Sequence, residues 1–193
     1  MHPFGFYLQL GFEHISDLSG FDHILFLIAL CAVYRIEQWK SIIILVTAFT
    51  VGHSITLALA SLEAVTIPSE IIEFLIPTTI LLTAIHNVVR RPANGPSKMG
   101  PTYAMALFFG LIHGMGFSNY FRALLMGDSS VAVPLLAFNV GIELGQLLVV
   151  AFIVGTAYLF LNVFSVKHRE WNLFVSGAAA GIATMLMVET RFW

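Results

Sequence analysis

Six apolar stretches, most of them close to the length of one membrane crossing, constrain this chain more than any other feature. A hydrocarbon core of about 30 Å requires about 20 apolar residues in a helix. Hydrophobic residues make up 58% of the 193 residues and charged residues 10%, against about 45–50% and 25% in soluble domains. The sequence therefore predicts an all-α fold, a polytopic membrane bundle with transmembrane helices over residues 20–34, 41–61, 71–89, 101–119, 134–164 and 171–188.

The connectors between these stretches are short, so no linker divides the chain into two globular parts. We expect residues 1–19, which mix aromatic and polar side chains, to form an outer interfacial segment that caps the bundle. Residues 20–193 are expected to form a single transmembrane helical domain. The stretch 20–34 is short for a crossing, and the stretch 134–164 is longer than one crossing requires.

The distribution of cations predicts the orientation, since short loops rich in Lys and Arg stay in the cytoplasm. One set of alternate loops holds seven of the nine Lys and Arg residues: Arg35, Lys40, Arg90, Arg91, Lys98, Lys167 and Arg169. Arg122 and Arg191 belong to the other set. We therefore expect both termini on the periplasmic or outer side.

Composition also excludes two classes of function. The net charge is −2 and no basic block is present, which argues against nucleic acid as a partner because backbone neutralisation needs clustered cations. The only cysteine is Cys31, so the chain has neither an internal disulfide nor a CxxC motif.

Ionisable side chains within spans are costly and normally face the bundle interior, which makes them candidate site residues. His23, His53 and His113 each lie twelve residues from the predicted cytoplasmic end of their helix. At 1.5 Å per residue, all three imidazoles stand about 18 Å above the inner boundary, on three different helices. The spacing predicts that they meet at one level of the membrane.

Two carboxylates accompany these histidines. Asp22 adjoins His23, and Glu143 is expected near the histidine level or somewhat above it. Asn139 and Gln146 share the Glu143 face of their helix, while Gly141 belongs to a small-residue stripe that lets another helix approach.

Span two adds a hydroxyl at Ser54, beside His53, whereas His86 is only four residues from Arg90 and lies outside the histidine layer. Three imidazoles with one or two carboxylates suit a divalent transition metal such as Zn²⁺, Ni²⁺ or Co²⁺. The metal ligands predicted are His23, His53, His113, Asp22 and Glu143. A structural alternative remains open, in which the same side chains form hydrogen bonds between helices.

Four ordered motifs resemble the HupE/UreJ family of bacterial membrane proteins. They are Asp22-His23 with the upstream His14, Gly52-His53-Ser54, Gly110-Leu111-Ile112-His113-Gly114, and Asn139-Val140-Gly141-Ile142-Glu143-Leu144-Gly145-Gln146. The resemblance implies a multi-pass protein of the bacterial inner membrane that handles nickel for hydrogenase and urease, with metalloenzyme-maturation proteins as candidate partners. The resemblance also implies that His14, Asn139 and Gln146 take part in binding. The stretch between His14 and Asp22 is longer than the family spacing, which separates His14 from the other ligands.

Two functions fit these residues. The favoured interpretation is binding and transport of a divalent metal, with Ni²⁺ or Co²⁺ implied by the resemblance. The alternative is a zinc-dependent intramembrane hydrolase of a lipid, lipopeptide or amide at the outer leaflet, in which Asp22 or Glu143 is the general base.

Overall fold

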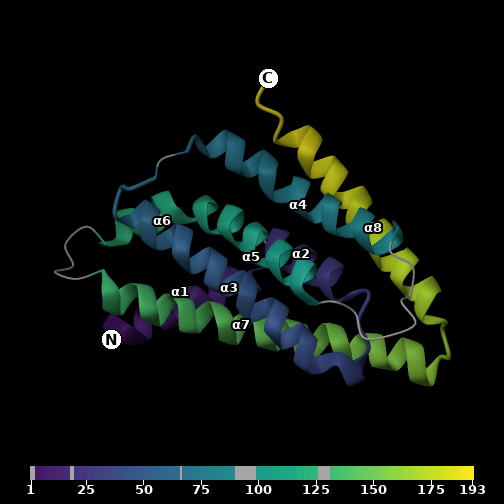
Figure 1. Cartoon of the computed structure of the whole chain (residues 1–193). Helices are drawn as coiled ribbons and strands as arrows, with labels where there is room; N and C mark the ends of the chain where they lie inside the picture. Colours follow the sequence, from purple (N-terminus) through teal and green to yellow (C-terminus); the bar gives the residue numbers. More distant parts are fainter. Residues whose placement is uncertain (1–2, 18–19, 66, 90–98, 126–130) are drawn as a thin grey trace.

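The computed structural model describes residues 3–17, 20–65, 67–89, 99–125 and 131–193, and all regular structure in these ranges is helical (Figure 1). The predicted all-α fold is therefore confirmed. The elements, in chain order, are α1 Pro3–Ser16, α2 Asp22–Cys31, η1 Ile36–Gln38, α3 Trp39–Ser61, α4 Ser69–Val89, α5 Met99–Gly116, α6 Ser118–Leu125, α7 Ala132–Tyr158, η2 Leu159–Val163 and α8 His168–Glu189.

Within the described residues, four helical stretches are long and apolar enough to cross a membrane: Ile36–Ser61, Ser69–Val89, Ala132–Val163 and His168–Glu189. The third runs for 32 residues without interruption, which confirms that this stretch exceeds one crossing. The apolar helix α2 has only 10 residues. The number of six crossings stays a prediction.

The predicted span 101–119 is wrong at its outer end. Helix α5 ends at Gly116, and a separate short helix, α6, begins at Ser118. Helix α6 carries polar side chains on one face, among them Arg122, whose guanidinium lies 3.7 Å from the carboxylate of Glu63. A helix with an exposed ion pair is favoured at the membrane surface rather than within the hydrocarbon.

Helix α1 packs lengthwise against α7 through glycines on both helices (Figure 1). A Cβ atom at Gly11 would overlap the carbonyl of Phe138, and one at Gly141 would overlap the carbonyl of Leu8. Further along, Gly145 lies against Phe12. The small-residue stripe on α7 is thereby confirmed as a helix contact, and residue numbers rise together along the two helices, so α1 and α7 run parallel.

Helix α2 continues beyond α1 along the same neighbour, because Ile24, Ile28 and Cys31 share a cavity wall with residues 149–158 of α7. At 1.5 Å per residue, α1 and α2 are about 21 Å and 15 Å long. The two helices thus lie along α7 one after the other. The helical structure stops at Ser16 and begins again at Asp22.

Helices α3 and α5 make the other close crossing. A Cβ atom at Gly52 would overlap the carbonyl of Leu107, and one at Gly110 would overlap that of Phe49. Glycine allows the two backbones to touch here, as small residues do in membrane helix pairs. This contact brings the middle of α3 against the middle of α5, where each helix carries a histidine.

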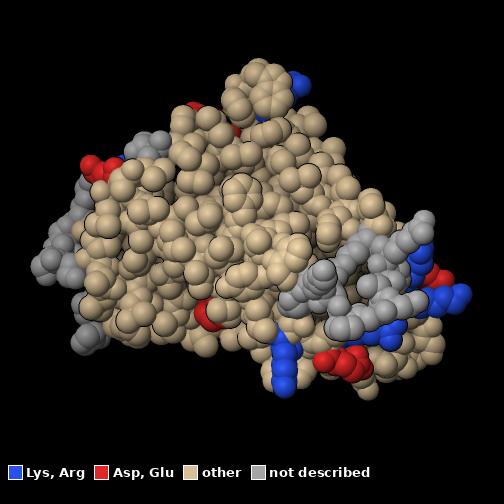
Figure 2. All heavy atoms as spheres, viewed as in Figure 1, with Lys and Arg blue, Asp and Glu red and all other residues tan. Residues whose placement is uncertain are grey.

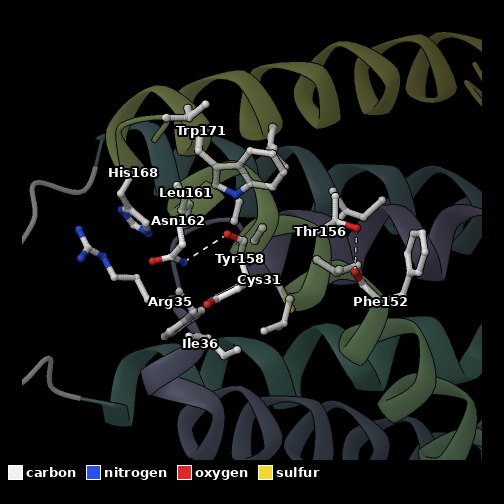
Figure 3. A pocket seen from close by; sticks show the side chains of 18 of the residues that line it. Cys31, Arg35, Ile36, Phe152, Thr156, Tyr158, Leu161, Asn162, His168 and Trp171 are labelled. Atoms are coloured by element: carbon white, nitrogen blue, oxygen red, sulfur yellow. Dashed lines mark hydrogen bonds between the residues drawn. The ribbon is translucent and has the colours of Figure 1, made fainter. Parts of the chain in front are cut away.

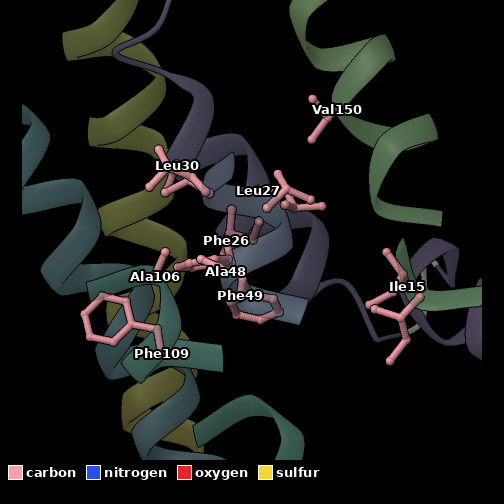
Figure 4. Close-up of a cluster of buried hydrophobic side chains, with 14 of the residues drawn as sticks. Ile15, Phe26, Leu27, Leu30, Ala48, Phe49, Ala106, Phe109 and Val150 are labelled. Atoms are coloured by element: carbon pink, nitrogen blue, oxygen red, sulfur yellow. The ribbon is translucent and has the colours of Figure 1, made fainter. Parts of the chain in front are cut away.

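One apolar core joins α1, α2, α3, α5 and α7 (Figure 4). Its largest fully buried members include Phe26, Phe49 and Leu27, which lie around the short helix α2. Long side chains on the outer faces of α7 and α8, such as Phe152 and Phe174, are exposed. Figure 2 shows a broad uncharged surface across the middle of the molecule, with most Lys and Arg gathered toward one end. This surface is consistent with a bundle that faces lipid.

Candidate metal centre

Four helices each contribute one imidazole to a common cluster: His14 from α1, His23 from α2, His53 from α3 and His113 from α5. The glycine contact between α3 and α5 brings His53 and His113 inward. At Gly114, beside His113, a Cβ atom would overlap the carbonyl of His53. His23, His53 and His113 are all less than 5% exposed.

The rings lie within a few ångströms of one another. The ring centre of His23 is 4.7 Å from that of His14, 5.9 Å from that of His53 and 5.2 Å from that of His113. The centres of His14 and His53 are 5.7 Å apart. His23 therefore lies next to each of the other three imidazoles.

The potential ligand atoms form two groups that share His23, so the predicted ligands His53 and His113 fall in different groups. One group is His14, His23 and His53, and the other is Asp22, His23 and His113. Within each group the ligand atoms all lie within 4.8 Å of one another. A small inward movement of each ring would bring three such atoms to the bond lengths of a metal ion, about 2.0–2.1 Å from its centre.

Most of the buried ring nitrogens have no hydrogen-bond partner within the described part of the chain. They are Nε2 of His14, Nε2 of His23, both nitrogens of His53 and Nδ1 of His113. Buried polar atoms in folded proteins are nearly always paired, so an unpaired group calls for a specific explanation. A metal ion at the centre of the cluster would satisfy several of them at once, and the residues present therefore fit such an ion.

Two neighbours orient the rings. The carboxylate oxygen Oδ1 of Asp22 lies 3.4 Å from Nδ1 of His23, and the hydroxyl of Thr79 on α4 lies 3.0 Å from Nε2 of His113. Such partners on the second nitrogen fix the tautomer and raise the affinity of a histidine for metal. Sequence reasoning missed Thr79, because nothing in the chain order links it to His113.

A cavity of about 830 Å³ leads to the cluster and includes His14, His23 and His113 in its lining. Among the described residues, its lining also includes no Lys or Arg and four carboxylates: Glu13, Asp17, Asp22 and Glu73. We call it the acidic vestibule. Carboxylates of one sign in a cleft with apolar walls concentrate cations. Three of these acids were not singled out from the sequence, although the predicted topology already placed them on the outer side.

Glu143 lies elsewhere. Its carboxylate accepts hydrogen bonds from the hydroxyls of Thr47 and Thr50 on α3, at 2.7 and 2.5 Å, and it belongs to neither group of ligand atoms. Thr47 and Thr50 precede His53 in α3, so in the predicted orientation the carboxylate of Glu143 lies inward of His53 along this helix.

The remaining predicted residues are also outside the cluster. Gln146 is fully buried and its side-chain amide lies 2.7 Å from the hydroxyl oxygen of Thr50, while the hydroxyl of Ser54 donates to the backbone carbonyl of Thr50. Asn139 has a buried oxygen without a partner in the described part of the chain. His86 is exposed on α4 and lies in neither group, as expected.

With this geometry in hand, comparison with known proteins is direct. A family model described as HupE / UreJ protein matches residues 1–191. The chain belongs to the HupE/UreJ family. The match confirms the resemblance seen in the motifs and extends it over the C-terminal helices. Neither the search of curated proteins nor the search of solved structures gave a match. Membership carries the family's link to nickel-related metal handling, and this chain has histidine and carboxylate groups able to hold a metal ion.

Proposed function

We propose that this protein binds a divalent transition metal, Ni²⁺ or Co²⁺, at the histidine cluster and passes it inward across the bacterial inner membrane. The metal is the cargo. The observation that carries this proposal is the convergence of four imidazoles and Asp22, with unpaired ring nitrogens, at the inner end of the acidic vestibule.

The donor set supports the choice of metal. Imidazole nitrogen suits Ni²⁺, Co²⁺ and Zn²⁺, whereas Mg²⁺ and Ca²⁺ prefer oxygen ligands. The expected ligands are His14, His23, His53, His113 and Asp22. Only a subset need bind at one moment, because His23 is shared by the two groups of ligand atoms.

The break between α1 and α2 supports transport. In many transporters, discontinuous helices form the ion site near the middle of the membrane, where helix C-termini turned toward a cation stabilise it. His14 lies in the last turn of α1 and His23 in the first turn of α2. The C-terminal end of α1, which carries the negative end of its helix dipole, would favour a cation at this break.

A second group of polar side chains lies between α3 and α7, inward of His53 along α3 in the predicted orientation: Thr47, Thr50, Glu143 and Gln146. A transported ion needs polar groups beyond its first site. In the proposed transport, the oxygens of these side chains bind the metal ion as it moves inward. Glu143 therefore acts after the ion has left the histidine cluster and not in the first binding event.

Calorimetry on the purified full-length protein with Ni²⁺, Co²⁺ and Zn²⁺ tests the binding site. The wild type and His86→Ala should each bind metal, and His53→Ala should lose binding by at least tenfold. Equal binding by His53→Ala and the wild type would contradict the proposal. Proteoliposomes containing a metal-sensitive dye then test transport, since Glu143→Gln should bind metal normally but deliver it more slowly.

The size of the vestibule keeps the hydrolase as a second candidate. A volume of about 830 Å³ is larger than one ion requires, and Asp22 beside His23 would serve as general base to a zinc-bound water. Four acidic side chains around the entrance disfavour an anionic lipid substrate. Zinc-dependent release of fatty acid from membrane lipids by the wild type, absent in Asp22→Asn, would support the hydrolase over the transporter.

A further inference from the structure

A second cavity, of about 340 Å³, lies away from the histidine cluster between α2, α7 and α8 (Figure 3). Its volume is within the range of small-molecule sites, about 300–1,000 Å³. Most of its wall is apolar and comes from the inner halves of these helices, including Ile28, Val149 and Ile153. We call it the inner cavity. The metal site described above makes no use of it.

The inner cavity has one polar end. Figure 3 shows Arg35, Asn162, His168 and Trp171 gathered there, while Phe152 lies at the opposite end. In the predicted orientation this polar end is at the cytoplasmic surface. An apolar cavity with a polar end at the membrane surface matches the shape of a lipid, whose chain needs hydrocarbon contact and whose head group needs polar partners.

Two basic side chains lie at this end, Arg35 and His168. Among the described residues, no carboxylate oxygen lies within 4.0 Å of the Arg35 guanidinium, although Glu37 also lines the cavity. His168 hydrogen-bonds the backbone of Tyr34, and its buried Nε2 has no partner among the described residues. A phosphate would accept hydrogen bonds from the guanidinium in bidentate geometry.

The aromatic residues agree with a lipid at the interface. Trp171 stacks on Phe160 with ring centres 5.2 Å apart, and Tyr158 also lines the cavity. Trp and Tyr concentrate at the level of lipid head groups. Basic pockets between transmembrane helices on the cytoplasmic side bind anionic head groups.

We propose that the inner cavity binds one glycerophospholipid of the cytoplasmic leaflet, with an acyl chain between α2, α7 and α8 and its phosphate at the Arg35 guanidinium. The lipid fills a space that the side chains leave open. It joins the end of α7 to the start of α8 and so fixes the angle between the two helices.

Native mass spectrometry of the delipidated full-length protein tests this proposal with dioleoyl phosphatidylglycerol as the probe. We expect one lipid per protein, binding at least fivefold more tightly than dioleoylglycerol, which has the same chains and no phosphate. Arg35→Gln should weaken phosphatidylglycerol binding about fivefold. Arg169→Gln is the matched control, because Arg169 is exposed near the same surface and does not line the cavity.

Three results would overturn the proposal. Equal binding of the two lipids would remove the role of the phosphate, and equal weakening by Arg35→Gln and Arg169→Gln would show only general attraction to charge. Thermal protection by inorganic phosphate as large as that by the lipid would assign the site to a free anion. The thermal midpoint of lipid-free Arg35→Gln shows whether this variant is folded. If it matches the midpoint of the wild type, weaker lipid binding reports the loss of the guanidinium and not a loss of folding.

Discussion

At the scale of single residues, the two membrane carboxylates have different surroundings. Asp22 faces His23 within the cluster, whereas Glu143 accepts hydrogen bonds from threonines outside it. We expect Asp22→Asn to weaken metal binding by about 10- to 100-fold, the range seen when a partner of a ligating histidine is lost. Glu143→Gln should leave the affinity unchanged. Calorimetry on both variants checks this contrast, and the reverse order would place the ion near Glu143.

Thr79 provides a second test at this scale. Its hydroxyl holds Nε2 of His113, which leaves Nδ1 of that ring for the ion. Thr79→Val keeps the shape and removes the hydroxyl, so we expect metal affinity to fall by about tenfold with little change in the thermal midpoint. Thr78→Val is the control, because the hydroxyl of Thr78 bonds only its own helix. Equal affinities for the two variants would show that Thr79 does not orient the ring.

At the scale of helices, glycines set the distance between α1 and α7. Gly141→Ala introduces a methyl group where the backbone of α1 already lies, and such overpacking costs about 1–3 kcal/mol. We expect a lower thermal midpoint and weaker metal binding, because His14 moves with α1. Gly155→Ala on the same helix meets open space and should change neither. Thermal melts with and without Ni²⁺ measure both effects, and a tolerated Gly141→Ala would contradict the packing account.

How far the sequence could predict these elements depends on whether helices are continuous. His53 and His113 lie in uninterrupted helices, so counting residues along each helix predicted that their imidazoles lie at one level of the membrane. A break in helical structure separates His14 on α1 from His23 on α2, so the height of His14 cannot be counted along the helix that holds His23. The packing of α1 on α7 places His14 in the cluster. The acids of the vestibule were equally hidden, since α1 and α4 bring them together from distant parts of the chain.

At the scale of the whole molecule, the topology is still to be measured. Cys31 is buried, so a cysteine introduced at an exposed position reports that position alone. We expect a membrane-impermeant thiol reagent to label Glu63→Cys in intact spheroplasts and to label Lys167→Cys only after the membrane is opened. Arg90, Arg91 and Lys98, on which the predicted orientation partly depends, lie outside the described residues. Labelling of both positions from the same side would refute the orientation and the inward direction of transport.

X-ray absorption spectroscopy of the Ni²⁺-loaded protein tests the central claim most directly, because it counts the imidazoles bound to the ion. The account predicts scattering from at least three imidazole rings, with one ring lost in His53→Ala and none lost in His86→Ala. A first shell of oxygen atoms alone, or a spectrum that His53→Ala leaves unchanged, would contradict a metal centre built from these four helices.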